Sequence, residues 1–213
     1  MAGPRSPKGR ARLVLSRLAE EYPEALCELD HRNAYELIAA TILSAQCTDA
    51  RVNSVTPALF ARYPTPEDLA AADPAEVEAI VKPTGFYRNK TKSLIGMANG
   101  LVDRFGGEVP TRMGDLTSLP GVARKTANVV RSVAFGLPGL PVDTHVLRLS
   151  ARLGLTEQDD PVKVETELNA MIPARERGAF SLRMILHGRR VCLARKPRCD
   201  QCVLNDFCPS SRV

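Results

Sequence analysis

The sequence predicts an all-α fold, and three observations support this expectation. Apolar residues recur at spacings of three and four along most of the chain, which is the pattern of helices with one buried face. No stretch of four or more residues alternates in the manner of a strand with turn signals at both ends. Clusters of proline and glycine separate the helical stretches, at residues 63–66, 82–85 and 136–141.

The expected helices follow one another with short connections. Leu13, Val14 and Leu18 give the first of them its apolar face, and the second repeats apolar residues more densely. The expected ranges are 11–21, 34–44, 49–62, 66–72, 75–81, 89–105, 113–118, 124–135, 144–153, 162–171 and 175–187. With 213 residues, the chain forms one domain or two small ones and is long enough to bury a core.

The composition excludes several classes of protein. An apolar content of 44% is too high for a disordered chain. The longest uninterrupted apolar stretch, residues 37–45, is far shorter than the roughly 20 residues that a membrane span needs. The first residues are basic, but no apolar segment follows them as it would in a secretory signal. We therefore expect a soluble cytoplasmic protein with no membrane contact.

The charge balance favours a polyanionic partner. The chain carries 29 basic and 24 acidic residues, for a net charge of +5. Basic residues gather in the N-terminal tail, at Arg5, Lys8, Arg10 and Arg12, and in the segment 189–198, which has no acidic residue. A solvated basic surface without a partner is the alternative interpretation of both clusters.

The 6 cysteines fall into two groups. Cys27 and Cys47 stand alone in apolar patterns that look helical, and we interpret them as small core residues. The other four are spaced C-x6-C-x2-C-x5-C, so four thiolates can converge on a structural zinc ion or an iron–sulfur cluster. Structural zinc sites usually have two closely spaced cysteine pairs, whereas only one C-x2-C pair is present here. The longer spacings on either side of it favour the cluster. These candidate ligands are Cys192, Cys199, Cys202 and Cys208.

Residues 116–128 predict a short helix, a tight Pro-Gly turn and a second helix. The free amides at the start of the second helix, together with its dipole, form a site for an anion such as a phosphate. Gly121 has no Cβ, so the backbone of the turn can approach a ligand closely. A plain connection between two helices is the alternative interpretation.

Lys125 and Asp143 are the candidate catalytic residues. Lys125 lies in the first turn of the helix after the hairpin, where the dipole disfavours its positive charge, and a neutral amine is a nucleophile. Asp143 begins the next helix, where it also suits an N-cap. The connection between the two helices is long enough to bring Asp143 beside Lys125.

Together these residues resemble the endonuclease III family, within the helix-hairpin-helix superfamily of DNA glycosylases. The resemblance covers nearly the whole chain after the N-terminal tail. Each motif is weak alone, but their order and spacing are specific. The motifs are Leu43-Ser44-Ala45-Gln46, Gly85-Phe86-Tyr87, the hairpin at 119–128, Val142-Asp143-Thr144-His145, His187-Gly188 and the four cysteines.

The resemblance implies a bifunctional glycosylase and lyase that excises oxidised pyrimidines in base excision repair. By this likeness Lys125 attacks C1′ of the deoxyribose, expels the base and forms a Schiff base, after which β-elimination cleaves the strand on the 3′ side. Asp143 activates the nucleophile or stabilises the positive charge that grows on the sugar. The partner is double-stranded DNA with a damaged pyrimidine or an abasic site, from which the nucleotide must be extruded.

The resemblance also assigns DNA contacts. Gln46 matches the residue that fills the vacated space, and Phe86 stands where the family commonly has a leucine wedge. Gly121 and Ala123 belong to the phosphate-binding turn, where Ala123 replaces the second glycine of the family pattern and its methyl group is expected to lower affinity. Arg195, Lys196 and Arg198 belong to a loop that contacts DNA.

The resemblance further implies two domains and a 4Fe–4S cluster bound by the four cysteines. A helical-barrel domain with the hairpin covers residues 27–137. A second helical domain joins residues 1–26 to 138–213 and holds the cluster, with the active site in the cleft between the two domains. We expect a monomer.

Three other functions would account for some of the same features. An adenine-specific mismatch glycosylase shares the cluster, but it lacks the hairpin lysine and has an extra C-terminal domain. A non-catalytic DNA-binding module would use the hairpin to bind phosphate and the metal site only for structure. A small electron carrier does not suit a lone cluster at the end of a large helical body.

Overall fold

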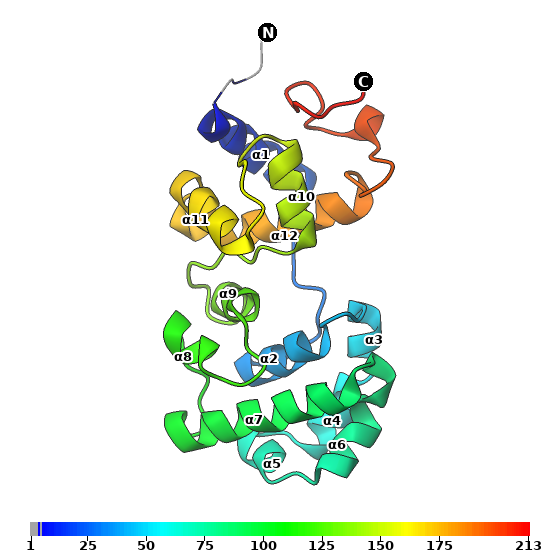
Figure 1. Cartoon of the computed structure of the whole chain (residues 1–213), viewed down its shortest axis with the longest axis vertical. Helices are drawn as coiled ribbons and strands as arrows, with labels where there is room; N and C mark the ends of the chain where they lie inside the picture. The colour runs from blue at the N-terminus through cyan, green and yellow to red at the C-terminus, as the bar shows by residue number, and fades with distance from the viewer. Residues whose placement is uncertain (1–3, 5) are drawn as a thin grey trace. The chain divides into compact units, whose positions relative to one another are not determined.

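The structure is a computed structural model that describes residue 4 and residues 6–213. Within these residues every regular element is a helix, so the predicted all-α fold is confirmed (Figure 1). The chain divides into two compact units: unit 1 comprises Met1–Leu26 and Leu137–Val213, and unit 2 comprises Cys27–Gly136. Arg5, one of the basic tail residues, lies outside the described residues.

Unit 2 is built around a helix that is buried almost all round. Every residue of this helix, α2 (Ala34–Leu43), except the first is buried, and it packs against the long helix α7 (Tyr87–Phe105) and against α9 (Arg124–Val133). The remaining elements of unit 2 are α3 (Asp49–Asn53), α4 (Thr56–Arg62), α5 (Pro66–Ala70), α6 (Pro74–Val81), the 3₁₀ helix η1 (Lys82–Thr84) and α8 (Met113–Thr117). α2 therefore supplies the centre of the unit 2 core.

Unit 1 has a separate core around α12 (Arg177–Arg190). This helix packs against α1 (Pro7–Glu21) and α10 (Thr144–Arg152), so the N-terminal helix joins elements from the other end of the chain. The remaining elements of unit 1 are α11 (Pro161–Met171) and the 3₁₀ helices η2 (Ala174–Glu176) and η3 (Cys199–Gln201). The C-terminal segment beyond α12 is mostly irregular (Figure 1).

Short polar side chains determine where many of the helices begin. Thr65 caps α5 in a capping box with Asp68, in which each side chain accepts a hydrogen bond from the backbone amide of the other residue. Proline occupies the first turn of several helices, where its missing N–H costs nothing. The residues whose side chains cap a helix are Ser6, Asn33, Thr48, Thr65, Asp73, Asp143 and Asp160.

Two expectations about local structure were wrong. The single helix expected at 49–62 is two helices, α3 and α4, because Pro57 in the first turn of α4 has no N–H to continue a helix from α3. Cys27 and Cys47 lie outside helices, although both are partly buried against the unit 2 core as small apolar residues.

No helix among residue 4 and residues 6–213 is long and apolar enough to cross a bilayer.

Candidate functional site

The hairpin predicted at 116–128 is present in unit 2. Helix α8 ends at Thr117, a turn closed by a 3.1 Å bond from the Val122 amide to the Leu119 carbonyl follows, and α9 begins at Arg124. Gly121 has a φ of +76°, which only glycine adopts without strain. A Cβ there would also lie 2.6 Å from Cβ of Ser93 on α7. The glycine therefore lets the turn pack against α7.

The start of α9 has no side-chain cap. Ala123 holds the N-cap position with ordinary dihedrals, φ −76° and ψ 168°, and makes no capping bond. Alanine adopts this conformation without strain, so the backbone of the turn does not need a second glycine here. Lys125 is the second residue of α9 and is exposed. An exposed lysine thus lies in the first turn of a helix whose N-cap side chain makes no capping bond.

Asp143 belongs to unit 1 and begins α10. Its Oδ1 accepts bonds of 2.8 Å from the amides of His145 and Val146, and the side chain is half-buried. The residues before it are fixed as well, because the buried Ser181 hydroxyl donates to the Pro141 carbonyl at 2.5 Å. The N-cap geometry expected for Asp143 is therefore present, and the carboxylate has one defined orientation relative to α10.

Gln46, Phe86 and Gly121, three of the predicted DNA contacts, line one pocket of about 280 Å³ in unit 2. Gln46 and Phe86 are the two non-glycine residues with positive φ among the described residues, at +53° and +48°. Such conformations are costly and persist where the surrounding structure enforces them. Phe86 is 64% exposed, so a large apolar side chain projects from a strained turn beside this pocket.

Lys90 lines the same pocket and was missed in the sequence. It is 5% exposed, and its Nζ donates a 2.8 Å bond to the carbonyl of Thr84, two residues before Phe86. Burial lowers the pKa of this amine. Helical periodicity offers the signal, because Lys90 stands on the same face of α7 as the buried Leu94 and Met97. The lysine ties the end of η1 to α7 and so supports the Phe86 turn.

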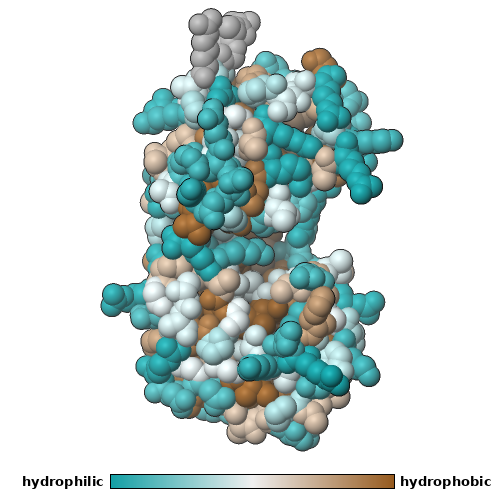
Figure 2. All heavy atoms as spheres, in the orientation of Figure 1, coloured by the Kyte–Doolittle hydropathy of each residue, from teal (hydrophilic) through white to brown (hydrophobic). Residues whose placement is uncertain are grey.

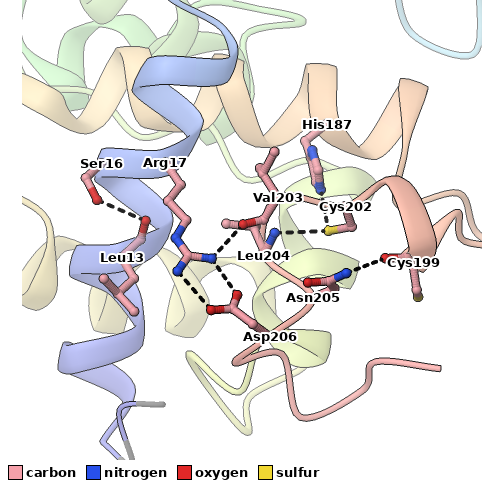
Figure 3. A network of polar contacts seen from close by, with 10 residues as sticks. All are labelled: Leu13, Ser16, Arg17, His187, Cys199, Cys202, Val203, Leu204, Asn205 and Asp206. Carbon is pink, nitrogen blue, oxygen red and sulfur yellow. Dashed lines mark hydrogen bonds and ion pairs between the residues drawn. The ribbon is translucent and has the colours of Figure 1, made fainter. Parts of the chain in front are cut away.

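The four clustered cysteines line one pocket of unit 1, whose apolar wall includes Leu149, Leu153, Val191 and Leu204. Several nitrogen atoms lie within hydrogen-bond distance of their sulfurs. The Leu204 amide and His187 Nε2 lie 3.4 and 3.3 Å from Cys202 Sγ, as Figure 3 shows, and Arg152 Nη1 lies 3.3 Å from Cys192 Sγ. Donors directed at thiolate ligands are the usual surroundings of a metal–sulfur centre.

The electrostatics of this pocket fit a bound metal centre. Burial, with a smaller contribution from the neighbouring cysteines, raises the pKa of Cys202 to about 11, and burial also raises the pKa of Cys208. Bare thiolates are thus unfavourable here unless a metal centre takes up their charge. Among the described residues, no group of three or more His, Cys, Asp or Glu side chains is placed to hold a metal ion.

The predicted basic loop follows α12. Arg195, Lys196 and Arg198 are all exposed, and the loop that carries them joins Cys192 to Cys199. Arg152 fixes the start of this loop, donating to the carbonyls of Leu193 and Ala194 at 2.8 and 2.7 Å. In Figure 2 the surface is largely hydrophilic where Figure 1 draws the C-terminal segment.

The sequence is similar to DNA repair proteins along most of its length. The family described as HhH-GPD superfamily base excision DNA repair protein matches residues 39–174, and the iron–sulfur binding domain of endonuclease III matches residues 192–208. Endonuclease III of Synechocystis sp. is 53% identical over 209 residues, covering 98% of this chain and 95% of the relative. Endonuclease III of Bacillus subtilis is 46% identical, covering 91% and 89%.

Solved structures agree with these sequence matches. An endonuclease III in a non-covalent complex with DNA superposes with a TM-score of 0.91 at 46% identity, covering 95% of both chains. An endonuclease III trapped in a covalent intermediate with DNA gives the same TM-score and identity, covering 95% of this chain and 96% of the other.

Proposed function

The chain belongs to the endonuclease III family of the HhH-GPD superfamily of base excision DNA repair proteins, and we propose that its substrates are oxidised pyrimidines in duplex DNA. It is a DNA glycosylase with lyase activity at abasic sites. The observation that carries this assignment is the full-length similarity, 53% over 98% of the chain, to an endonuclease III. Solved complexes of relatives with DNA support DNA as its partner, and the proposed form of this DNA is the duplex.

Lys125 is the proposed nucleophile. It is exposed at the start of α9, where the N-cap Ala123 has no side-chain acceptor that could bind the amine. The amine attacks C1′ of the damaged nucleotide, and the bond between C1′ and the base breaks, so that the base leaves with a proton. The sugar ring then opens to a Schiff base on Nζ.

The lyase step follows from this Schiff base. The imine acidifies the proton on C2′, and its removal expels the 3′ phosphate from C3′ in a β-elimination. Water then hydrolyses the imine and frees Lys125. Asp143 is the proposed second catalytic residue, and its carboxylate assists base departure by activating the nucleophile or by stabilising the positive charge on the sugar. Its orientation by the α10 amides supports this role.

The proposed DNA contacts come from both units. Gln46 fills the space that the extruded nucleotide leaves, and Phe86 wedges into the stack, which its exposure and rigid turn favour. The hairpin backbone at Gly121 and Ala123 binds a phosphate, as helix N-termini commonly do. Arg195, Lys196 and Arg198 bind phosphates from the loop between Cys192 and Cys199.

Cys192, Cys199, Cys202 and Cys208 are the proposed ligands of the iron–sulfur cluster, and 4Fe–4S is the proposed type. The iron–sulfur binding domain found at 192–208 and the donors aimed at the sulfurs support this assignment. The cluster supplies a rigid cross-link within the loop when bound, and the catalytic steps above use only side chains and backbone. We further propose that the protein acts as a monomer on DNA in the bacterial cytoplasm.

A strand-cleavage assay tests the substrate class. End-labelled duplexes with one thymine glycol, one abasic site, or an A·G mismatch are incubated with the protein under single-turnover conditions. We expect cleavage of the first two, with the 3′ end of a β-elimination, and an intact mismatch duplex. Excision of adenine from the mismatch would favour the related adenine-specific glycosylase instead, and binding without any cleavage would favour a non-catalytic module.

A further inference from the structure

A row of three hydrogen-bonded side chains leads from the N-terminal helix to one of the four cysteines in the segment 192–208. Tyr22, the C-cap of α1, and His187 on α12 are 6% and 1% exposed. The Tyr22 hydroxyl lies 3.1 Å from His187 Nδ1, and His187 Nε2 lies 3.3 Å from Cys202 Sγ (Figure 3 draws the second contact). None of the roles proposed above uses Tyr22 or His187.

The direction of these hydrogen bonds follows from the chemistry at each end. A cysteine that ligates a metal is a thiolate, which accepts hydrogen bonds and donates none. His187 must therefore present a proton on Nε2 to satisfy Cys202. A neutral imidazole carries one proton, so Nδ1 is then an acceptor, and the Tyr22 hydroxyl is the donor that it needs.

Further contacts hold Tyr22 and His187 in place. The His187 carbonyl accepts from the amide of Cys192 at 2.8 Å, so this residue contacts two of the four cysteines, one through its side chain and one through its backbone. Arg183 Nε donates to the Tyr22 carbonyl at 3.1 Å, and the Tyr22 and His187 rings meet edge to face with centroids 5.9 Å apart. These contacts fix the positions of both residues.

We propose that Tyr22 and His187 are positioning residues of the iron–sulfur cluster, in which the Tyr22 hydroxyl selects the His187 tautomer that donates Nε2–H to the Cys202 sulfur. A hydrogen bond to a ligand sulfur stabilises the more negative, reduced state of a cluster and so raises its reduction potential. The tyrosine hydroxyl acts on the cluster only through the imidazole. A purely structural pair would fill the same space without affecting the potential.

Protein-film voltammetry on the cluster-loaded protein without DNA tests this proposal, because its readout is independent of base excision. Tyr22→Phe removes one oxygen and keeps the ring, so His187 loses the partner that fixes its tautomer. We expect the reduction potential to fall by an amount equal to about tenfold in the one-electron equilibrium constant, or about 59 mV. Resonance Raman bands of the Fe–S(Cys) stretches should shift in the same variant.

His187→Gln provides the rescue arm, since its amide N–H2 donates to sulfur without any tautomer to fix. We expect a potential near that of the unmodified protein, with no further change when Tyr22→Phe is added. Tyr35→Phe is the matched control, because it removes another buried hydroxyl, which donates to the Tyr63 carbonyl at 3.0 Å in unit 2. An unchanged potential in Tyr22→Phe, or an equal shift in Tyr35→Phe, would overturn the proposal. If His187→Gln does not load the cluster, Tyr22→Phe against its control still decides.

Discussion

Asp143 accepts two backbone bonds through Oδ1 and is also the proposed catalytic carboxylate, and two substitutions separate these roles. Asparagine caps a helix about as well as aspartate but carries no charge. We expect Asp143→Asn to keep the stability and the DNA affinity while base excision slows by about 10²-fold or more. Asp143→Ala should in addition lose about 1 kcal/mol of stability with the cap.

Single-turnover excision rates, thermal unfolding and DNA binding together measure this difference. Asp160→Asn is the control, because Asp160 caps α11 in the same way, accepting from Val162 and Lys163, without a proposed catalytic role. Excision by Asp143→Asn at the unmodified rate would show that Asp143 is an N-cap and nothing more.

The sequence identified residues that line the unit 2 pocket, but it did not predict their backbone conformation. The motif match singled out Gln46 and Phe86, and both lie on one pocket. Their left-handed backbone could not be predicted, because neither is a glycine and other residues rarely adopt this conformation. Lys90 was missed because a lysine is normally solvated, and only its place on the buried face of α7 shows otherwise.

At the scale of elements, the loop between Cys192 and Cys199 offers a test that depends on charge alone. Replacing Arg195, Lys196 and Arg198 together with glutamine removes three exposed cations. If each binds a phosphate, the slope of log K against log[salt] should become shallower by about 2.7, at about 0.9 for each contact. DNA affinity measured between about 50 and 200 mM salt gives this slope.

Arg175→Gln controls for a general loss of positive charge, since Arg175 is exposed on η2 and paired with Glu176. An unchanged slope in the triple variant would remove the loop from the DNA interface.

Helix existence was easier to predict from the sequence than helix ends. The apolar periodicity located the buried faces, but α1 begins at Pro7 rather than residue 11, since Ser6 caps it and proline suits its first turn. The break between α3 and α4 depends on Pro57, whose effect on a helix varies with its position in the turn. The apolar pattern runs across the break, so periodicity alone did not reveal it.

At the scale of the whole molecule, each unit has its own core, and the segment 192–208 that carries the four cysteines belongs to unit 1 alone. This segment also contacts α1, because Arg17 donates to the Val203 carbonyl at 2.7 Å and pairs with Asp206 (Figure 3). Metal binding couples to the folding of the segment that supplies the ligands. Removal of iron should therefore loosen unit 1 and leave unit 2 folded.

Hydrogen exchange before and after chelation of the iron measures this effect. Amides of α1 and of residues 192–208 should exchange faster, while amides of α2 and α7 in the unit 2 core keep their protection. Equal loss of protection in both units would contradict the independence of the two cores.

The overall architecture could be predicted only in part. Periodicity indicated an all-helical chain, and cysteine spacing indicated a metal site, since both are local patterns. The packing of α1 against α12 joins residues far apart in the sequence, and no local pattern carries that information. The same holds for the chain from Tyr22 through His187 to Cys202, which forms only when both ends of the chain meet in unit 1.

Trapping with borohydride tests the central claim, that Lys125 forms a Schiff base with DNA. The reductant converts the imine to a stable amine, so the protein becomes covalently attached to a duplex that contains an oxidised pyrimidine. Lys163→Gln is the matched control, because Lys163 is also exposed in the first turn of a helix, α11, whose amides Asp160 caps. We predict an adduct with the unmodified protein and with Lys163→Gln, and none with Lys125→Gln, although Lys125→Gln still binds the duplex. An adduct that persists in Lys125→Gln would contradict the account.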